Sequence, residues 1–108
     1  MEKKESFFID VLNILPSEID CFIQAPSLDN TYIENLCKDS DYEYYRLINL
    51  DDKIKKSIID EELRNPYSIF IQNIQIFSRG KLLFEGFDGV DYGVISKEIV
   101  IPMWFKSQ

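Results

Sequence analysis

The feature that most constrains the fold of this chain is a change in hydrophobic periodicity near residue 68. Before that point, apolar residues such as Phe8, Val11 and Leu12 recur at the three- and four-residue spacing of one helix face. After it, apolar residues such as Ile74 and Ile76 alternate at every second position, as in a strand. Helices followed by short antiparallel strands indicate the α+β class.

The first half of the chain, roughly residues 5–64, is predicted to form several short helices. Pro16 closes the first of these helices. Two capping-box patterns, Thr31–Glu34 and Ser40–Glu43, each place a hydroxyl three residues before a Glu and predict two further helix starts. A fourth helical pattern starts at Asp51–Asp52 and ends at Asn65–Pro66, because the residue before a proline is pushed out of the helical region.

One segment of this half, residues 17–24, fits two patterns. Ile19, Cys21 and Ile23 alternate as in a strand, whereas Ile19, Phe22 and Ile23 fit a helical turn. We favour a short helix there.

The second half, residues 67–105, is predicted to be β-rich, with an antiparallel sheet of about three to four strands. Arg79–Gly80 and Asp88–Gly89 are typical of tight turns between strands. Ile99–Ile101 is expected to be the last short strand. The 108 residues match the commonest domain size, so we expect one globular domain over residues 1–108.

Charge and composition restrict the possible functions. The chain has 12 basic and 19 acidic residues, a net charge of −7, and no histidine. Polyanions bind through basic surfaces, so neither nucleic acid nor an anionic membrane is an expected partner. The absence of histidine removes the commonest general base and the commonest metal ligand. We therefore expect a protein that is not an enzyme, with no metal and no cofactor.

The two cysteines, Cys21 and Cys37, could in principle pair with each other. The first residues, Met1–Glu5, are mixed in charge and do not resemble a signal peptide. We therefore expect free, mostly buried thiols in a cytoplasmic protein.

The run Asp39–Tyr45 concentrates acidic groups and phenol rings and has two interpretations. It could be the entrance of a helix, where acids favour the dipole. It could instead be an interface, where tyrosines give stiff contact area and acids attract a cationic partner.

A second acidic-aromatic segment, Glu85–Gly93, contains three glycines. Its spacing matches neither a phosphate-binding loop nor a calcium-binding loop, and its acids would repel phosphate. We interpret it as a hairpin whose glycines give the turn geometry. Asp88, Asp91 and Tyr92 are a reserve contact surface on it.

The apolar end Ile99–Phe105 also has two interpretations. It is expected to pack on the sheet as part of the core. If it is exposed, it would be a docking site or a dimer contact.

In size, charge and overall sequence character the chain is similar to the small acidic immunity proteins that bacteria encode beside polymorphic or contact-dependent toxins. The run Asp39–Tyr45 and the segment Gly80–Phe105 carry this resemblance. The resemblance implies a protein that neutralises a toxin, often a basic nuclease, by covering its active site or a neighbouring surface. It implies no particular fold and no residue roles.

The leading hypothesis is a binding protein that inhibits a cationic toxin domain and is itself a monomer. An alternative is a structural or regulatory subunit that assembles through a sheet edge and its C-terminal aromatic segment. The residues expected to contact a basic protein partner are Asp39, Asp41, Tyr42, Glu43, Tyr45, Asp88, Asp91 and Tyr92.

Overall fold

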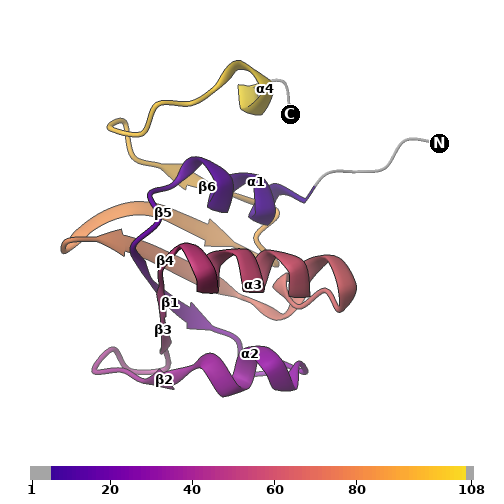
Figure 1. Ribbon diagram of the computed structural model, residues 1–108. Helices are drawn as coiled ribbons and strands as arrows, with labels where there is room; N and C mark the ends of the chain where they lie inside the picture. Colours follow the sequence, from indigo (N-terminus) through magenta and orange to yellow (C-terminus); the bar gives the residue numbers. More distant parts are fainter. Residues whose placement is uncertain (1–5, 107–108) are drawn as a thin grey trace.

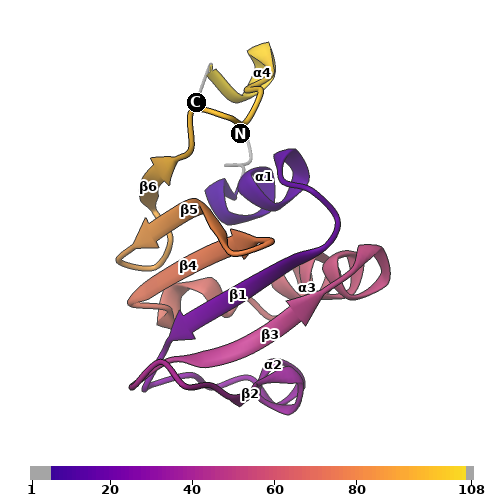
Figure 2. The ribbon, with the colours of Figure 1, turned by 90° about the vertical axis from the view of Figure 1, so that its left-hand side faces the viewer.

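The structure of the protein is a computed structural model that describes residues 6–106. One antiparallel sheet of six strands, in the order β2-β3-β1-β4-β5-β6, forms its centre (Figures 1 and 2). The elements in chain order are α1 (Phe7–Ile14), β1 (Ile19–Gln24), α2 (Thr31–Leu36), β2 (Lys38–Asp39), β3 (Arg46–Leu50), α3 (Asp52–Arg64), a 3₁₀ turn (Ser68–Phe70), β4 (Asn73–Ser78), β5 (Lys81–Phe87), β6 (Tyr92–Ile95) and α4 (Met103–Lys106).

Helices α1 and α3 lie against one face of the sheet, and Figure 2 looks onto the opposite face. Every second residue of β1 is buried, as the two-residue period of a strand requires. Ile23 of β1 and Ile76 of β4 join Val11 and Leu12 of α1 and Ile58 of α3 in one hydrophobic core. The core therefore lies between the sheet and these two helices.

The α+β class is confirmed, but the predicted division of the chain into a helical half and a sheet half is wrong. Strands β1, β2 and β3 lie within residues 19–50, and the sheet has six strands rather than three to four. Residues 17–24 contain strand β1 and not a short helix. Cys21 of β1 pairs with Ile48 on one side and with Ile76 on the other. These pairings between distant residues outweigh the weak local helical pattern.

The helix predicted to start at Ser40–Glu43 is also absent. The Ser40 hydroxyl accepts a hydrogen bond from the Tyr42 amide (3.1 Å) and lies 2.7 Å from the Tyr45 carbonyl oxygen, to which it donates. The serine thus closes a turn between β2 and β3, a local pattern that competes with helix capping. The chain then enters β3 at Arg46.

Helices occur at the other three capping or periodic patterns. Asp51 caps α3 by accepting from the Ile54 amide at 2.8 Å. Helix α2 is capped by Asn30, and not by Thr31 as the capping box predicts. The short strand predicted at Ile99–Ile101 is wrong, because this segment is irregular and leads into α4.

Both cysteines are free, Cys21 in the core and Cys37 half-buried. Within residues 6–106, no helix combines the length and the apolar character that spanning a membrane requires.

Candidate functional site

The face of the sheet opposite α1 and α3, here called the open sheet face, remains partly exposed. Its side chains come from the outward positions of five strands, which the register brings opposite one another. They are Asp20, Phe22, Leu47, Asn49, Asn73, Gln75, Phe77, Glu85, Phe87, Tyr92 and Val94. An unpartnered sheet face with this many aromatic rings is a candidate binding surface.

A row of four rings crosses the open sheet face. Tyr42 and Tyr45, from the turn between β2 and β3, stack with centroids 4.3 Å apart and planes at 6°. The Tyr42 ring then meets Phe22 at 6.0 Å and 72°, and Phe22 meets Phe77 at 5.7 Å and 86°. Edge-to-face and stacked contacts of this kind stabilise aromatic clusters and fix ring orientation.

A hydrogen-bond network ties the turn to the sheet. The Tyr45 hydroxyl donates to Asn73 Oδ1 at 2.6 Å, and Asn73 Nδ2 donates to Glu85 Oε2 at 3.0 Å. Gln75 Nε2 donates to the same Glu85 oxygen at 3.2 Å and to the Tyr42 hydroxyl at 3.3 Å. The two tyrosines are therefore held above the sheet by both their rings and their hydroxyls.

The hairpin between β5 and β6 continues this surface. Phe87 pairs with Asn73 across β4 and β5, and its ring stacks on Tyr92 at 5.4 Å. The Tyr92 hydroxyl donates to Asp88 Oδ2 at 3.1 Å. The two acidic-aromatic segments that the sequence presents separately thus border one continuous face.

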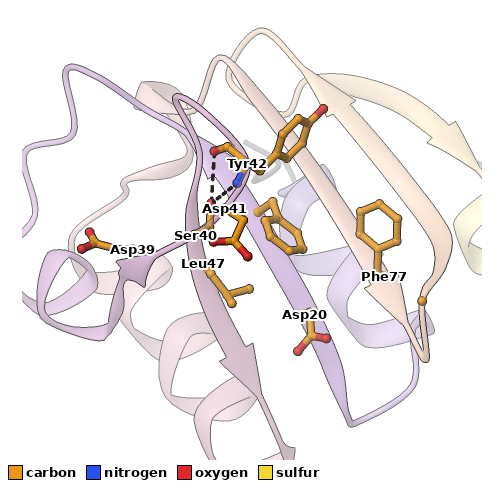
Figure 3. A pocket seen from close by; sticks show the side chains of 9 residues that line it. Asp20, Asp39, Ser40, Asp41, Tyr42, Leu47 and Phe77 are labelled. Carbon is orange, nitrogen blue, oxygen red and sulfur yellow. Dashed lines mark hydrogen bonds between the residues drawn. The ribbon is translucent and has the colours of Figure 1, made fainter.

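A hollow of about 670 Å³ extends across the open sheet face from β2 to β4 (Figure 3). Its lining combines three aromatic rings, three aspartates and one leucine with Ser40 and Gly80, the members being Asp20, Phe22, Asp39, Ser40, Asp41, Tyr42, Leu47, Phe77 and Gly80. In Figure 3 the Asp41 carboxylate lies near Leu47, whereas the Asp39 carboxylate points away from the other labelled side chains. Asp20 and Asp41 are therefore the acidic groups that a bound molecule would meet.

Lys38 is connected to the hollow through a chain of two hydrogen bonds that ends at Asp20. Its Nζ donates to Asn49 Oδ1 at 2.6 Å, and Asn49 Nδ2 donates to Asp20 Oδ1 at 2.7 Å. An amide thus stands between the ammonium group and the Asp20 carboxylate. Among the described residues, the two salt bridges are Arg64–Glu61 and Lys81–Glu98, so neither involves Asp20 or Asp41.

The predicted contact residues fall into three groups. Asp39, Asp41 and Tyr42 line the hollow, and the Tyr45 ring stacks on the Tyr42 ring. Glu43 is exposed at the tip of the same turn. Asp88, Asp91 and Tyr92 form the third group and are exposed at the β5–β6 hairpin.

The sequence interpretation missed Asp20, Phe22, Leu47 and Phe77, which also line the hollow. The signal for the first two was present, because the alternation of residues 19–23 as a strand places Asp20 and Phe22 on the face opposite the core. A helix over residues 17–24, as predicted, would not place these two side chains on a sheet face.

Two tyrosine hydroxyls on this surface, those of Tyr45 and Tyr92, have a raised pKa. Burial, with the nearby Tyr42 and Glu85, raises the pKa of Tyr45. The hydrogen bond to Asp88 raises the pKa of Tyr92, because it favours the protonated phenol. Both groups therefore remain neutral donors at physiological pH.

Of the three hairpin glycines, one has the predicted turn role and two do not. Gly89 lies in the turn with φ of 79°, but Gly86 and Gly93 pair with each other in β5 and β6. In the described residues, no group of three or more histidine, cysteine or acidic side chains is placed to hold a metal ion.

Comparison with known proteins gives no further assignment. No protein-family model, curated protein or solved structure matches this chain.

Proposed function

We propose that this protein is a non-enzymatic binding module that neutralises a cationic protein, in the manner of the small acidic immunity proteins that it resembles. Its docking surface is the open sheet face, with the turn at residues 40–45 as the main contact and the β5–β6 hairpin as the second. We also propose that it acts in the cytoplasm, as a monomer.

The observation that carries this proposal is the combination of a hollow lined by aromatic rings with aspartates that form no ion pair within residues 6–106. Tyr42, Phe22 and Phe77 supply contact area, and Asp20 and Asp41 line the same hollow without an ion pair in the described part of the chain. Acids arranged against a basic partner raise the association rate, to about 10⁸–10⁹ M⁻¹s⁻¹ at low salt. Rigid tyrosines then slow dissociation, because little side-chain entropy remains to be lost.

The test begins with capture of the natural partner. The immobilised protein is exposed to an extract of its native host, and the bound chain is identified and purified. The double variant Asp41→Lys, Glu43→Lys is compared with Asp60→Lys, which reverses an exposed charge on α3. Association rates are then measured over about 50–500 mM salt.

We expect the wild-type rate to fall steeply with salt, and the double variant to associate about tenfold more slowly with a flatter salt dependence. The Asp60 variant should behave as the wild type does. An association rate that stays unchanged over this salt range would contradict electrostatic attraction. Equal effects of the two charge reversals would contradict the open sheet face as the docking surface.

A second candidate function is a subunit that assembles through its β6 edge and C-terminal segment. The exposure of Val94 (67 %), Val100 (87 %) and Met103 (79 %) favours it, since exposed apolar side chains recur along this part of the chain. Phe105 is nevertheless buried and packs on Phe7 at 5.7 Å, so part of this segment belongs to the core. Light scattering over a dilution series distinguishes the two candidates. A strict monomer at micromolar concentration contradicts self-assembly.

A further inference from the structure

The hollow on the open sheet face places carboxylates and aromatic rings around one space. Asp20 and Asp41 contribute the carboxylates, while Phe22, Tyr42 and Phe77 contribute the rings (Figure 3). Its volume of about 670 Å³ lies within the range of about 300–1,000 Å³ that is typical of small-ligand sites. The hollow is open to solvent and is large enough to accommodate one side chain of a partner against its rings and carboxylates.

We propose that this hollow receives an arginine side chain of the basic partner. The inference rests on the proposed function, since it names the group by which that partner is recognised. A guanidinium group is planar, stacks on aromatic rings and donates paired hydrogen bonds to a carboxylate. A lysine ammonium group is a compact and strongly hydrated charge, so it would use the carboxylates but gain less from the rings.

The ring geometry favours such a ligand. Phe22 meets both Tyr42 and Phe77 edge to face, at 72° and 86°, so the three rings that line the hollow do not form a flat stack. The Tyr42 side chain is held in position by stacking on the Tyr45 ring and by the hydrogen bond that its hydroxyl accepts from Gln75. A site that is already rigid loses less conformational entropy when a ligand binds.

Charge complementarity excludes the other obvious occupants. A second copy of this chain would bring the same acidic face and a net charge of −7 toward the hollow. Phosphate groups would be repelled by Asp20 and Asp41. Lys38 offsets part of the Asp20 charge through Asn49, but it forms no ion pair with Asp20 or Asp41.

The direct test is an NMR titration of the full chain with acetyl-arginine methylamide. The matched probes are acetyl-lysine methylamide and the neutral isostere acetyl-citrulline methylamide. We expect saturable shifts of Phe22, Leu47 and Phe77 with arginine, at a Kd of about 1–20 mM. Binding of the lysine probe should be about fivefold weaker, and the citrulline probe should give no saturable shift.

Two variants and one control locate the site. Asp20→Asn keeps the oxygen that accepts from Asn49, and Asp41→Asn changes an exposed side chain, so both variants should fold. Each should weaken arginine binding by about fivefold. Asp60→Asn, on α3 at the other side of the sheet, should leave arginine binding unchanged. The amide spectrum of each variant verifies the fold.

The inference is overturned if arginine gives no saturable shift, if citrulline shifts the same residues equally, or if the responding residues lie on another face. These failures differ from failure of the proposed function. If the captured partner still depends on Asp41 and Glu43 while the arginine probe does not bind, arginine recognition is wrong and the docking surface stands. If arginine binds but the charge reversals leave partner association unchanged, the docking role is wrong.

Discussion

Tyr42 and Tyr45 stack almost in parallel above the open sheet face, with ring centroids 4.3 Å apart. They lie on a turn whose closure depends on Ser40, and Tyr44 between them has a positive φ of 73°. The positive φ turns the chain so that Tyr42 and Tyr45 share one side while Tyr44 is left outside. The stacked pair is held in place by its ring contact and hydrogen bonds, and Tyr42 thereby lines one side of the candidate site.

Replacement of Tyr45 by phenylalanine tests how firmly this stacked pair is attached. The change removes the hydrogen bond to Asn73 and keeps the ring. We expect the free energy of unfolding to fall by about 1 kcal/mol, the usual net value of one such hydrogen bond. Urea unfolding measures the loss. Tyr44→Phe is the matched control, since Tyr44 is 77 % exposed, and equal effects of the two changes would contradict the anchoring role.

Replacement of Asn30 by alanine tests the junction between α2 and α3. Asn30 Oδ1 accepts from the Ile33 amide, and its Nδ2 donates to Glu61 Oε2 at 2.9 Å and to the Asn65 carbonyl at 3.0 Å. The variant loses a helix cap and leaves the buried Glu61 without this partner. We expect a loss of about 2–3 kcal/mol in urea unfolding.

The control for this change is Asn35→Ala, an exposed residue of the same helix. Alanine has a higher helix propensity than asparagine, so this variant should be as stable as the wild type or slightly more so. A loss at Asn30 no larger than the effect at Asn35 would show that the junction contributes little.

Replacement of Gly93 by alanine tests the packing of the last strand. A Cβ atom at this position would lie 2.6 Å from the Phe84 ring and closer still to the Glu85 carbonyl oxygen. Phe84 is fully buried, so its ring cannot move away without disturbing the core. We expect destabilisation of about 2 kcal/mol or more.

Val94→Ala is the control for Gly93, because the neighbouring Val94 side chain is exposed. Its effect on thermal unfolding should be small. If Gly93→Ala unfolds at the wild-type temperature, β6 is not held against Phe84 as the structure describes.

The parts of the fold that local sequence signals predict are those built from local contacts. Asp51 and Pro66 bracket α3, and Arg79–Gly80 forms the turn between β4 and β5 with positive φ at both residues. The parts that fail depend on partners far along the chain. Strand β1 is stabilised by pairing with β3 and β4, and neither pairing is visible in the residues 19–24 themselves.

The candidate site follows the same rule. The contact residues Asp41, Tyr42 and Tyr45 are predictable from the sequence, because they lie within one short run rich in acids and tyrosines. Phe22 and Phe77 are not, because they meet only when β1 and β4 pair. The capping-box pattern at Ser40 misled for a related reason, since a serine hydroxyl closes a turn as readily as it caps a helix.

The buried thiol of Cys21 predicts a specific dependence of stability on pH. Burial, with a smaller contribution from Asp20, raises its pKa from 9.0 to about 12. Above pH 9 the unfolded chain therefore loses the thiol proton while the folded chain retains it. Ionisation favours the unfolded state, so stability is fully present below about pH 9 and decreases as the pH rises toward 12.

We expect the wild type to lose about 1 kcal/mol more than Cys21→Ala between about pH 8 and pH 10. Urea unfolding in the presence of a reductant gives both curves, and only their difference in slope matters, because the cavity left by alanine lowers stability at every pH. Burial also raises the pKa of Tyr67, with a smaller contribution from Cys21, and Tyr67 is present in both proteins. Parallel curves would show that the Cys21 thiol ionises as readily in the folded chain as in the unfolded one, and that this strand does not exclude water.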